Sequence, residues 1–209
     1  QARVATTSAS TEIIVDAANT PVITMQAPLT SLAGLAGSTS IVRVTGIPTA
    51  KTLPILNGGT QPSIFSLSTR FAMVYGLRFE NGGIAIDAKM APSGPPAMQM
   101  AMVSGCDFEG QTSSAIRLRG TGNDSTKMMV RNCSMRNMPV GFRMDDQTVN
   151  GTLMSDNEHI TMDGVALGCS FFAGGSGQVS KCTIWRASLV NGETLAETTG
   201  SPRPTQPQM

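Results

Sequence analysis

The chain has 209 residues and a net charge of +1, and only 14% of its residues are charged. This length suits one ordinary domain or one elongated solenoid. The low, balanced charge argues against nucleic acid and anionic lipid as partners, because both attract proteins through a strong positive field. No apolar run approaches the roughly 18 residues of a membrane span, and a chain that starts at Gln1 rather than Met leads us to expect export after removal of a leader.

The N-terminal part predicts an arm followed by loosely spaced strands. Residues 1–11 are expected to form an extended arm. Short runs rich in apolar residues then follow at residues 13–15, 41–44 and 64–67. They fit the strand pattern of the later part of the chain more loosely, and we expect short strands at these three places.

Five segments in the centre share one pattern: apolar, two turn-type residues, small or apolar, polar, apolar. They are residues 74–79, 103–108, 130–135, 154–159 and 179–184. Their fourth positions are Leu77, Cys106, Cys133, Asn157 and Cys182, at separations of 29, 27, 24 and 25 residues. Such a repeat with unequal spacing predicts a solenoid whose loops differ in length, with these five residues stacked as one inward column.

A second alternating stretch follows most of these segments, at residues 84–86, 116–118, 142–144 and 165–171. A strand, a bend, a second strand and a turn that close in about 25 residues make one rung of a parallel β-helix. We therefore predict an all-β, single-stranded β-helix of about seven rungs over residues 12–191. A β-sandwich also has short strands, but its hairpins would not give columns of like residues at this spacing.

Residues 130–137 read Val-Arg-Asn-Cys-Ser-Met-Arg-Asn. This segment resembles the V-x-x-N-C-x-F-x-N rung motif of the pectate-lyase-like right-handed β-helix superfamily, and the resemblance covers roughly residues 60–190. It implies a right-handed fold and nothing specific about chemistry. In pectate lyases an arginine acts on the uronate and acidic residues hold calcium, whereas here only Asp145, Asp146 and Asp163 form a loose acidic group. The N-T-D, G-H-D and R-I-K motifs of polygalacturonases do not occur.

Charged residues follow the outer face of the second alternating stretch, where an enzyme of this superfamily would have its groove. The candidates for glycan binding are Arg117, Arg119, Arg143, Asp145 and Asp146. The alternative interpretation is a solvated face on which Arg119 and Asp145 form a surface ion pair of little energetic value. A single Tyr and a single Trp argue against a high-affinity sugar groove, since such grooves usually present several aromatic platforms.

The four cysteines lack the C-x-x-C spacing of a zinc site. Cys106 and Cys133 would lie on neighbouring rungs, either as small apolar ladder residues or as a disulfide. The only histidine, His159, is expected to point inward beside Asn157, in a structural role or as a general base. These residues give no complete active site, so we predict no catalytic residue, metal or cofactor.

Residues 192–209 contain three prolines between residues 202 and 207, and they are expected to form an extended C-terminal arm. Two function classes fit the whole chain. The first is a non-catalytic structural or adhesive protein that self-associates as a homo-oligomer or filament, in an extracellular filament, a surface layer or a virus particle. The second is a carbohydrate-active or carbohydrate-binding β-helix, with a surface polysaccharide as its partner.

Overall fold

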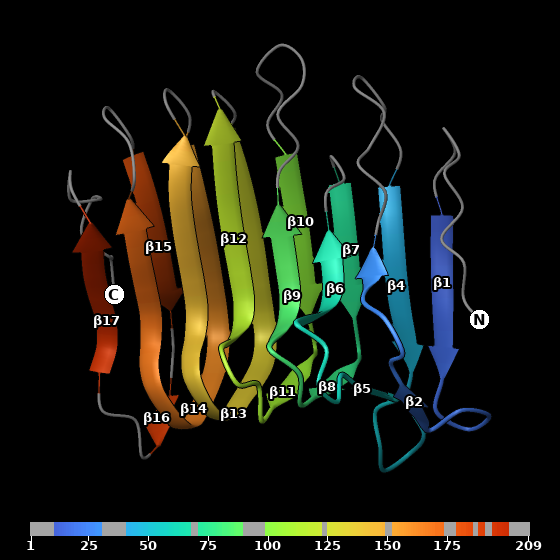
Figure 1. Cartoon of the computed structure of the whole chain (residues 1–209). Helices are drawn as coiled ribbons and strands as arrows, with labels where there is room; N and C mark the ends of the chain where they lie inside the picture. The colour runs from blue at the N-terminus through green and yellow to red at the C-terminus, as the bar shows by residue number, and fades with distance from the viewer. Residues whose placement is uncertain are drawn as a thin grey trace.

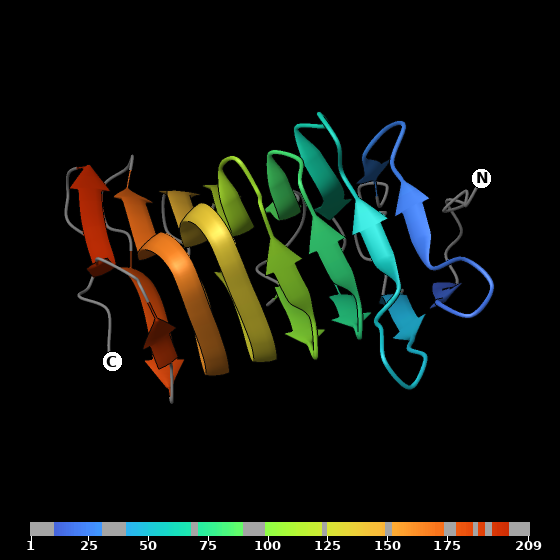
Figure 2. The ribbon, with the colours of Figure 1, turned by 90° about the horizontal axis from the view of Figure 1, so that it is seen from below.

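The computed structural model describes residues 11–30, 41–67, 71–89, 99–122, 125–148, 152–173, 179–185, 188–190 and 194–200. All regular structure in these ranges is β-strand, and every strand pairing is parallel. The chain winds into coils that stack side by side, with the first described strands at one end and the last strands at the other (Figures 1 and 2). The expected parallel β-solenoid is confirmed.

Each coil adds a strand to each of three faces. The first face contains β1 (Thr11–Asp16), β4 (Ile41–Ile47), β7 (Phe71–Tyr75), β10 (Gln99–Ser104), the beginnings of β13 (Ser125–Thr148) and β14 (Thr152–Ala173), and β15 (Val179–Trp185). The second contains β2 (Val22–Thr24), β5 (Ile55–Asn57), β8 (Arg78–Glu80), β11 (Asp107–Glu109), the middles of β13 and β14, and β16 (Ser188–Val190). The third contains β3 (Leu29–Thr30), β6 (Ser63–Leu67), β9 (Ile84–Lys89), β12 (Ser114–Gly122), the ends of β13 and β14, and β17 (Thr194–Gly200).

The core consists of inward columns, one residue per rung. On the first face the column is Val44, Val74, Val103, Val130 and Asn157, all buried. On the second face, Phe79 and Phe108 stack with ring centroids 5.1 Å apart and an interplanar angle of 7°. Full burial of a large apolar side chain contributes about 1.5–3 kcal/mol, so these columns supply most of the stability.

Two corners of the coil require a left-handed backbone. At the first, Gly76, Gly105, Asn132 and His159 have φ between 52° and 63°. At the second, Asn81, Gly110, Asn137 and Gly164 have φ between 53° and 72°. Glycine and asparagine are the residues that adopt this conformation at least cost, which explains why turn-type residues recur at these positions in the sequence.

The register of the fourth expected segment is wrong by three residues. Asn157 pairs with Val130, and Ile160 is the residue that pairs with Cys133. Cys182 pairs with Ser155 and therefore does not follow Asn157 in a column. The observed register places the buried side chains of Ile160 and Met162 in inward positions, and its last three steps are each 27 residues, from Val103 to Ile184. Of the expected column, Leu77, Cys106 and Cys133 do occupy successive rungs and are buried.

His159 does not point into the core. It lies at the first corner with a φ of 54°, and its side chain is 46% exposed. The expected segments 130–135 and 154–159 align His159 with Met135, which would have buried the imidazole. In the observed register Met162 pairs with Met135 and takes the inward position. A role for His159 as an inward general base is therefore excluded.

The boundaries of the stack also differ slightly from those expected. The first strand starts at Thr11, and Thr194–Gly200 forms β17, which pairs in register with β14. The stack therefore extends beyond residue 191, and part of the expected C-terminal arm is a strand of the third face. Residues 1–10 and 201–209 lie outside the described residues.

We predict that Gly105→Ala lowers the free energy of unfolding by about 1–2 kcal/mol, the cost of a left-handed residue with a Cβ. The nearest atom to an added Cβ would be the Gly76 nitrogen at 4.0 Å, so the loss reflects backbone conformation and not a clash. Chemical denaturation measures it. Gly105→Asn is the matched control and should lose less, because Asn132 holds the equivalent corner. Equal stability of the Ala variant and the wild type would contradict this account of the corner.

Candidate functional site

Four of the residues expected to bind glycan lie on the outside of the third face, Arg117 and Arg119 on β12 and Arg143 and Asp145 on β13. The register places Arg117 beside Arg143 and Arg119 beside Asp145. Asp146 pairs with Gly120, and its side chain is outside the described part of the chain. The fold thus gathers the four described candidates on two neighbouring rungs.

Asp87 is the centre of this cluster, and the sequence analysis missed it. Arg117 donates from Nε to Oδ1 of Asp87 (3.0 Å) and from Nη2 to Oδ2 (2.7 Å). Arg119 donates to the same two oxygens over 2.9 and 2.7 Å. The Asp87 side chain is only 7% exposed. Two bidentate guanidinium pairs on one carboxylate make a strong, geometrically defined contact.

Asp87 could have been found from the alternation alone. It comes directly after the alternating residues 84–86, at the next outward position, and it occupies the column of Arg117. An acid directly next to an arginine across a parallel pair is a stabilising cross-strand contact. Asp87 was overlooked because the sequence analysis took the alternating stretch to end at Ile86.

The remaining charges of the cluster pair on the next rung. Arg143 donates from Nε to Oδ1 of Asp145 over 2.9 Å, with side-chain exposures of 42% and 12%. The hydrogen bonds to Asp87 and the charges of Asp87 and Asp145 raise the pKa of Arg117, against a smaller opposing effect of burial. Both described carboxylates are therefore engaged by arginine, which favours the interpretation as an internal ion-pair network over an open sugar-binding face.

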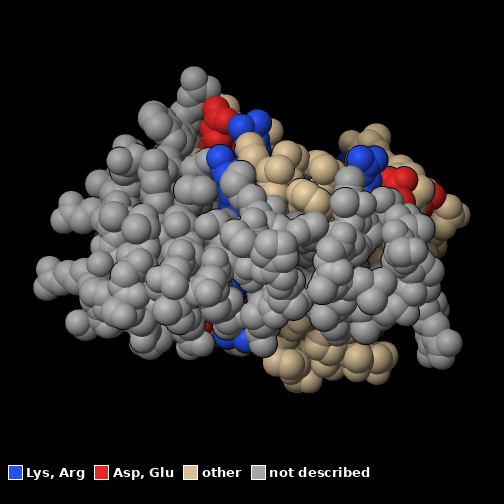
Figure 3. All heavy atoms as spheres, turned by 90° about the horizontal axis from the view of Figure 1, so that it is seen from above, with Lys and Arg blue, Asp and Glu red and all other residues tan. Residues whose placement is uncertain are grey.

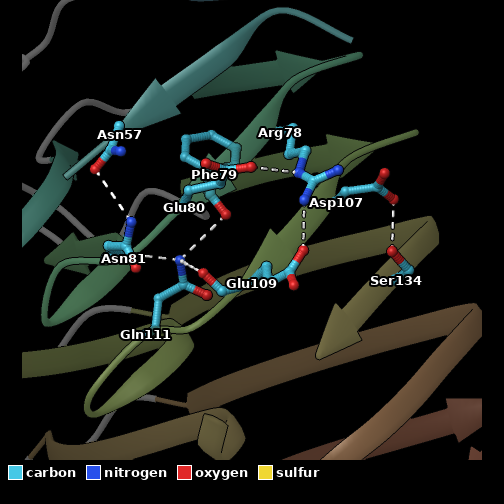
Figure 4. A network of polar contacts seen from close by, with 9 residues as sticks. All are labelled: Asn57, Arg78, Phe79, Glu80, Asn81, Asp107, Glu109, Gln111 and Ser134. Atoms are coloured by element: carbon cyan, nitrogen blue, oxygen red, sulfur yellow. Dashed lines mark hydrogen bonds and ion pairs between the residues drawn. The ribbon is translucent and has the colours of Figure 1, made fainter. Parts of the chain in front are cut away.

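A second polar network crosses the outside of the second face (Figure 4). Arg78 contacts Glu80 at 2.8 Å on its own strand and Glu109 at 2.5 Å on the next rung. Ser134 donates to Asp107 over 2.5 Å. These side chains are half-buried, and their contacts run along the stack, so this network links consecutive rungs rather than forming a separate pocket.

Gln111 closes the second corner of the fourth coil from inside. One more residue separates Gly110 from Ser114 than separates the equivalent Asn81 from Ile84, and Gln111 is that extra residue. Its side-chain amide donates to the carbonyl oxygens of Phe79, Asn81 and Glu109 over 3.2–3.3 Å. Gln111 is 1% exposed, and its amide supplies an additional donor to these carbonyls where the insertion interrupts the regular pairing. The Glu109 carbonyl also accepts from the Asn81 N–H over 2.9 Å.

The cysteines are ladder residues. Cys106, Cys133 and Cys169 are buried, and the Sγ atoms of Cys106 and Cys133 donate to the carbonyls of Ser104 (3.4 Å) and Arg131 (3.2 Å). The hydrogen bond with the Cys106 side chain and burial raise the pKa of the Cys133 thiol well above 9.0. A thiol that is protonated and buried is a poor nucleophile and metal ligand. The side chain of Cys182 lies outside the described residues.

In the described ranges, no three His, Cys, Asp or Glu side chains come together in a group that could hold a metal ion, and no helix is long and apolar enough to cross a membrane. No known protein family matches the chain, and no curated protein shows significant similarity to it.

We predict that Asp87→Asn lowers the free energy of unfolding by about 2–3 kcal/mol, because two half-buried guanidiniums lose their shared carboxylate. Denaturant titration measures the change. The matched control is Arg143→Gln, which removes a more exposed pair and should cost less than about 1 kcal/mol. Equal losses in the two variants would show that Asp87 is not the centre of the cluster.

We also predict that the free energy of unfolding falls as the pH rises above 9.0, the ordinary pKa of the Cys133 thiol. Above that pH the unfolded chain releases the thiol proton while the folded chain retains it, so the unfolded state is favoured until the folded pKa is reached. Denaturation at several pH values measures the slope. Cys133→Ala is the control for all other titrating groups, and an unchanged slope in this variant would refute the assignment.

Proposed function

We propose that this protein is a non-catalytic structural or adhesive β-solenoid that self-associates, in an extracellular filament, a surface layer or a virus particle. The observation that carries the proposal is the state of the two ends of the stack. β1 pairs with β4, and the strands of the last coil pair with β14, so among the described strands each end has one unpaired edge. Unpaired edges are templates for the addition of another strand.

The end formed by β1 and β2 also exposes apolar surface. The inward side chains Ile13 and Ile23 pack against the core but are only partly buried, whereas Val74 and Phe79 in the interior are at most 1% exposed. In repeat proteins the terminal repeats need a polar cap or a partner to remain soluble. Partly covered core columns beside an unpaired edge support addition of a second copy end to end.

We further propose that the solenoid is right-handed and belongs with the pectate-lyase-like superfamily. Support comes from the segment that resembles the superfamily motif. In that segment Asn132 takes the left-handed corner and Cys133 the inward position that follows it. The location outside the cell rests on this fold-level resemblance.

The carbohydrate-binding alternative has weaker support. It depends on Arg117, Arg119, Arg143, Asp145 and Asp146 being available to a ligand. The bidentate contacts of Arg117 and Arg119 with Asp87 occupy much of their donor capacity, and replacing a buried carboxylate partner by a sugar would leave that carboxylate without its arginines. Glycan binding at these residues stays a prediction.

End-to-end assembly is tested by Thr24→Pro. Ile55 N–H donates to the Pro21 carbonyl and Met25 N–H donates to the Asn57 carbonyl, both over 2.8 Å. Because the N–H groups of successive residues point to opposite sides of a strand, the Thr24 N–H points away from β5, toward the unpaired edge of β2. Proline removes that donor and blocks strand addition. We expect particles of the variant in electron micrographs to be several-fold shorter than those of the wild type.

Thr24→Ala is the matched control, because it keeps the amide donor and should assemble as the wild type does. Circular dichroism checks that both variants remain folded. A proline variant that assembles to the same length would refute addition at this edge. Release of reducing ends from a polysaccharide by the purified protein would favour the carbohydrate-active alternative.

A further inference from the structure

The outer surface of the first face differs in chemistry from the other two. The outward positions of the second and third faces are mostly charged or polar, as in the two networks described above. On the first face, most outward positions of β7, β10 and the start of β13 are apolar or aromatic and half-buried, whereas Ser104, Lys127 and Arg131 are polar. The apolar and aromatic ones are Phe71, Met73, Tyr75, Met100, Met102 and Met129. We call these six residues the methionine face.

The methionine face is continuous across three rungs. Met73, Met102 and Met129 form one column, and Phe71 lies beside Met100. The Tyr75 hydroxyl donates to Met102 Sδ over 3.2 Å. Toward the N-terminal end the described outward residues of β4 are Arg43 and Thr45, so the apolar surface ends there, and Ile14, which is 58% exposed, lies beyond them on β1. Methionine adapts to irregular contacts and is frequent at binding surfaces, and contiguous apolar surface of this kind marks interaction sites.

Charged residues border the methionine face at both of its ends along the stack. At the N-terminal end, Arg43 lies 3.8 Å from Glu12. At the other end, Arg131 lies 3.7 Å from Glu158. In a view from above, Figure 3 shows uncharged atoms between two groups of charged side chains along one edge of the molecule. Each end of the face carries a positively and a negatively charged side chain. When two copies lie face to face with their stacks in opposite directions, the positive side chains of one copy can therefore lie near the negative side chains of the other.

We infer that the methionine face binds the same face of a second copy, with the two stacks antiparallel. The two-fold axis lies along the strands at β10, so that Met102 meets Met102 of the second copy and β7 meets β13. Tyr75 then opposes Arg131, a cation–π contact, and Arg43 comes close to Glu158. In an isologous interface every such contact occurs twice.

The methionine face alone is smaller than a standard interface, and the neighbouring rungs of the first face complete it. Its three rungs extend roughly 14 Å along the stack, whereas the first face as a whole extends roughly 30 Å along the stack and roughly 20 Å along the strands. The whole first face gives about 600 Å² for each copy, against the ~800 Å² of a standard interface. The inference rests on the self-association proposed above, but it uses a side of the stack and not its ends, so the two contacts can be separated by experiment.

The test uses two variants, Met102→Lys and Met102→Glu, each examined alone and then mixed in equal amounts. Since Met102 meets itself across the axis, each variant alone places like charges together and should weaken the dimer by about 100-fold or more. The mixture places opposite charges together and should restore dimers. Sedimentation velocity measures the dimer fraction, and Thr24→Pro is included in every chain to suppress end-to-end growth.

Thr161→Lys is the control, because Thr161 is an exposed outward residue of the second face and its charge should leave the dimer intact. Failure of the mixture to restore dimers, with both variants folded by circular dichroism, overturns the proposed register. A Thr24→Pro chain that is monomeric at all concentrations overturns the lateral contact, while end-to-end particles of the wild type would leave the structural proposal standing. Short particles together with lateral dimers support both.

Discussion

Parallel, in-register hydrogen bonding between neighbouring rungs is the interaction on which the other features of this molecule depend. The strands of one rung do not pair with one another, since the N–H and C=O groups of each strand bond to the rung before it and the rung after it. Any residue that bends the coil at one level must therefore be matched at the next level. This is why left-handed residues at the corners, valines on the first face and aromatic rings on the second recur one above another.

The same constraint separates the chemistry of the three outer surfaces. A charge on one strand has its nearest neighbours at the equivalent positions of adjacent rungs, so charges of opposite sign are most stable when they share a column or lie one step away from it. The third face uses this geometry to hold two arginines on Asp87, and the second uses it to join Arg78 to Glu109. In the middle of the first face the equivalent positions of β7, β10 and β13 are Met73, Met102 and Met129, so this column is apolar for the same reason that the others are charged.

The sequence predicts those parts of this structure that repeat along the chain, and it fails where the repeat is broken. Columns of like residues can be read from one chain, and they identify the parallel solenoid and the inward Cys106 and Cys133. Asn157 was misplaced because it is a polar residue in a valine column, so the pattern of apolar and turn-type residues was matched three positions too early and put Asn157 in the place of Ile160. Gln111 was missed because an insertion breaks the repeat at the point where it matters. The methionine face was missed because apolar residues on both sides of a strand hide the alternation that distinguishes inside from outside.

The direction of the inter-rung hydrogen bonds has a mechanical consequence. They run along the long axis of the stack, so a force that pulls the two ends apart stretches the hydrogen bonds between rungs. The interfaces between rungs are arranged in series, and each of them therefore bears the full force. A rung of 27 residues that peels away releases about 90 Å of extended chain, against a rise of about 4.8 Å while it is stacked. A molecule built in this way resists compression along its axis and yields to traction one rung at a time, lengthening roughly 20-fold per released coil.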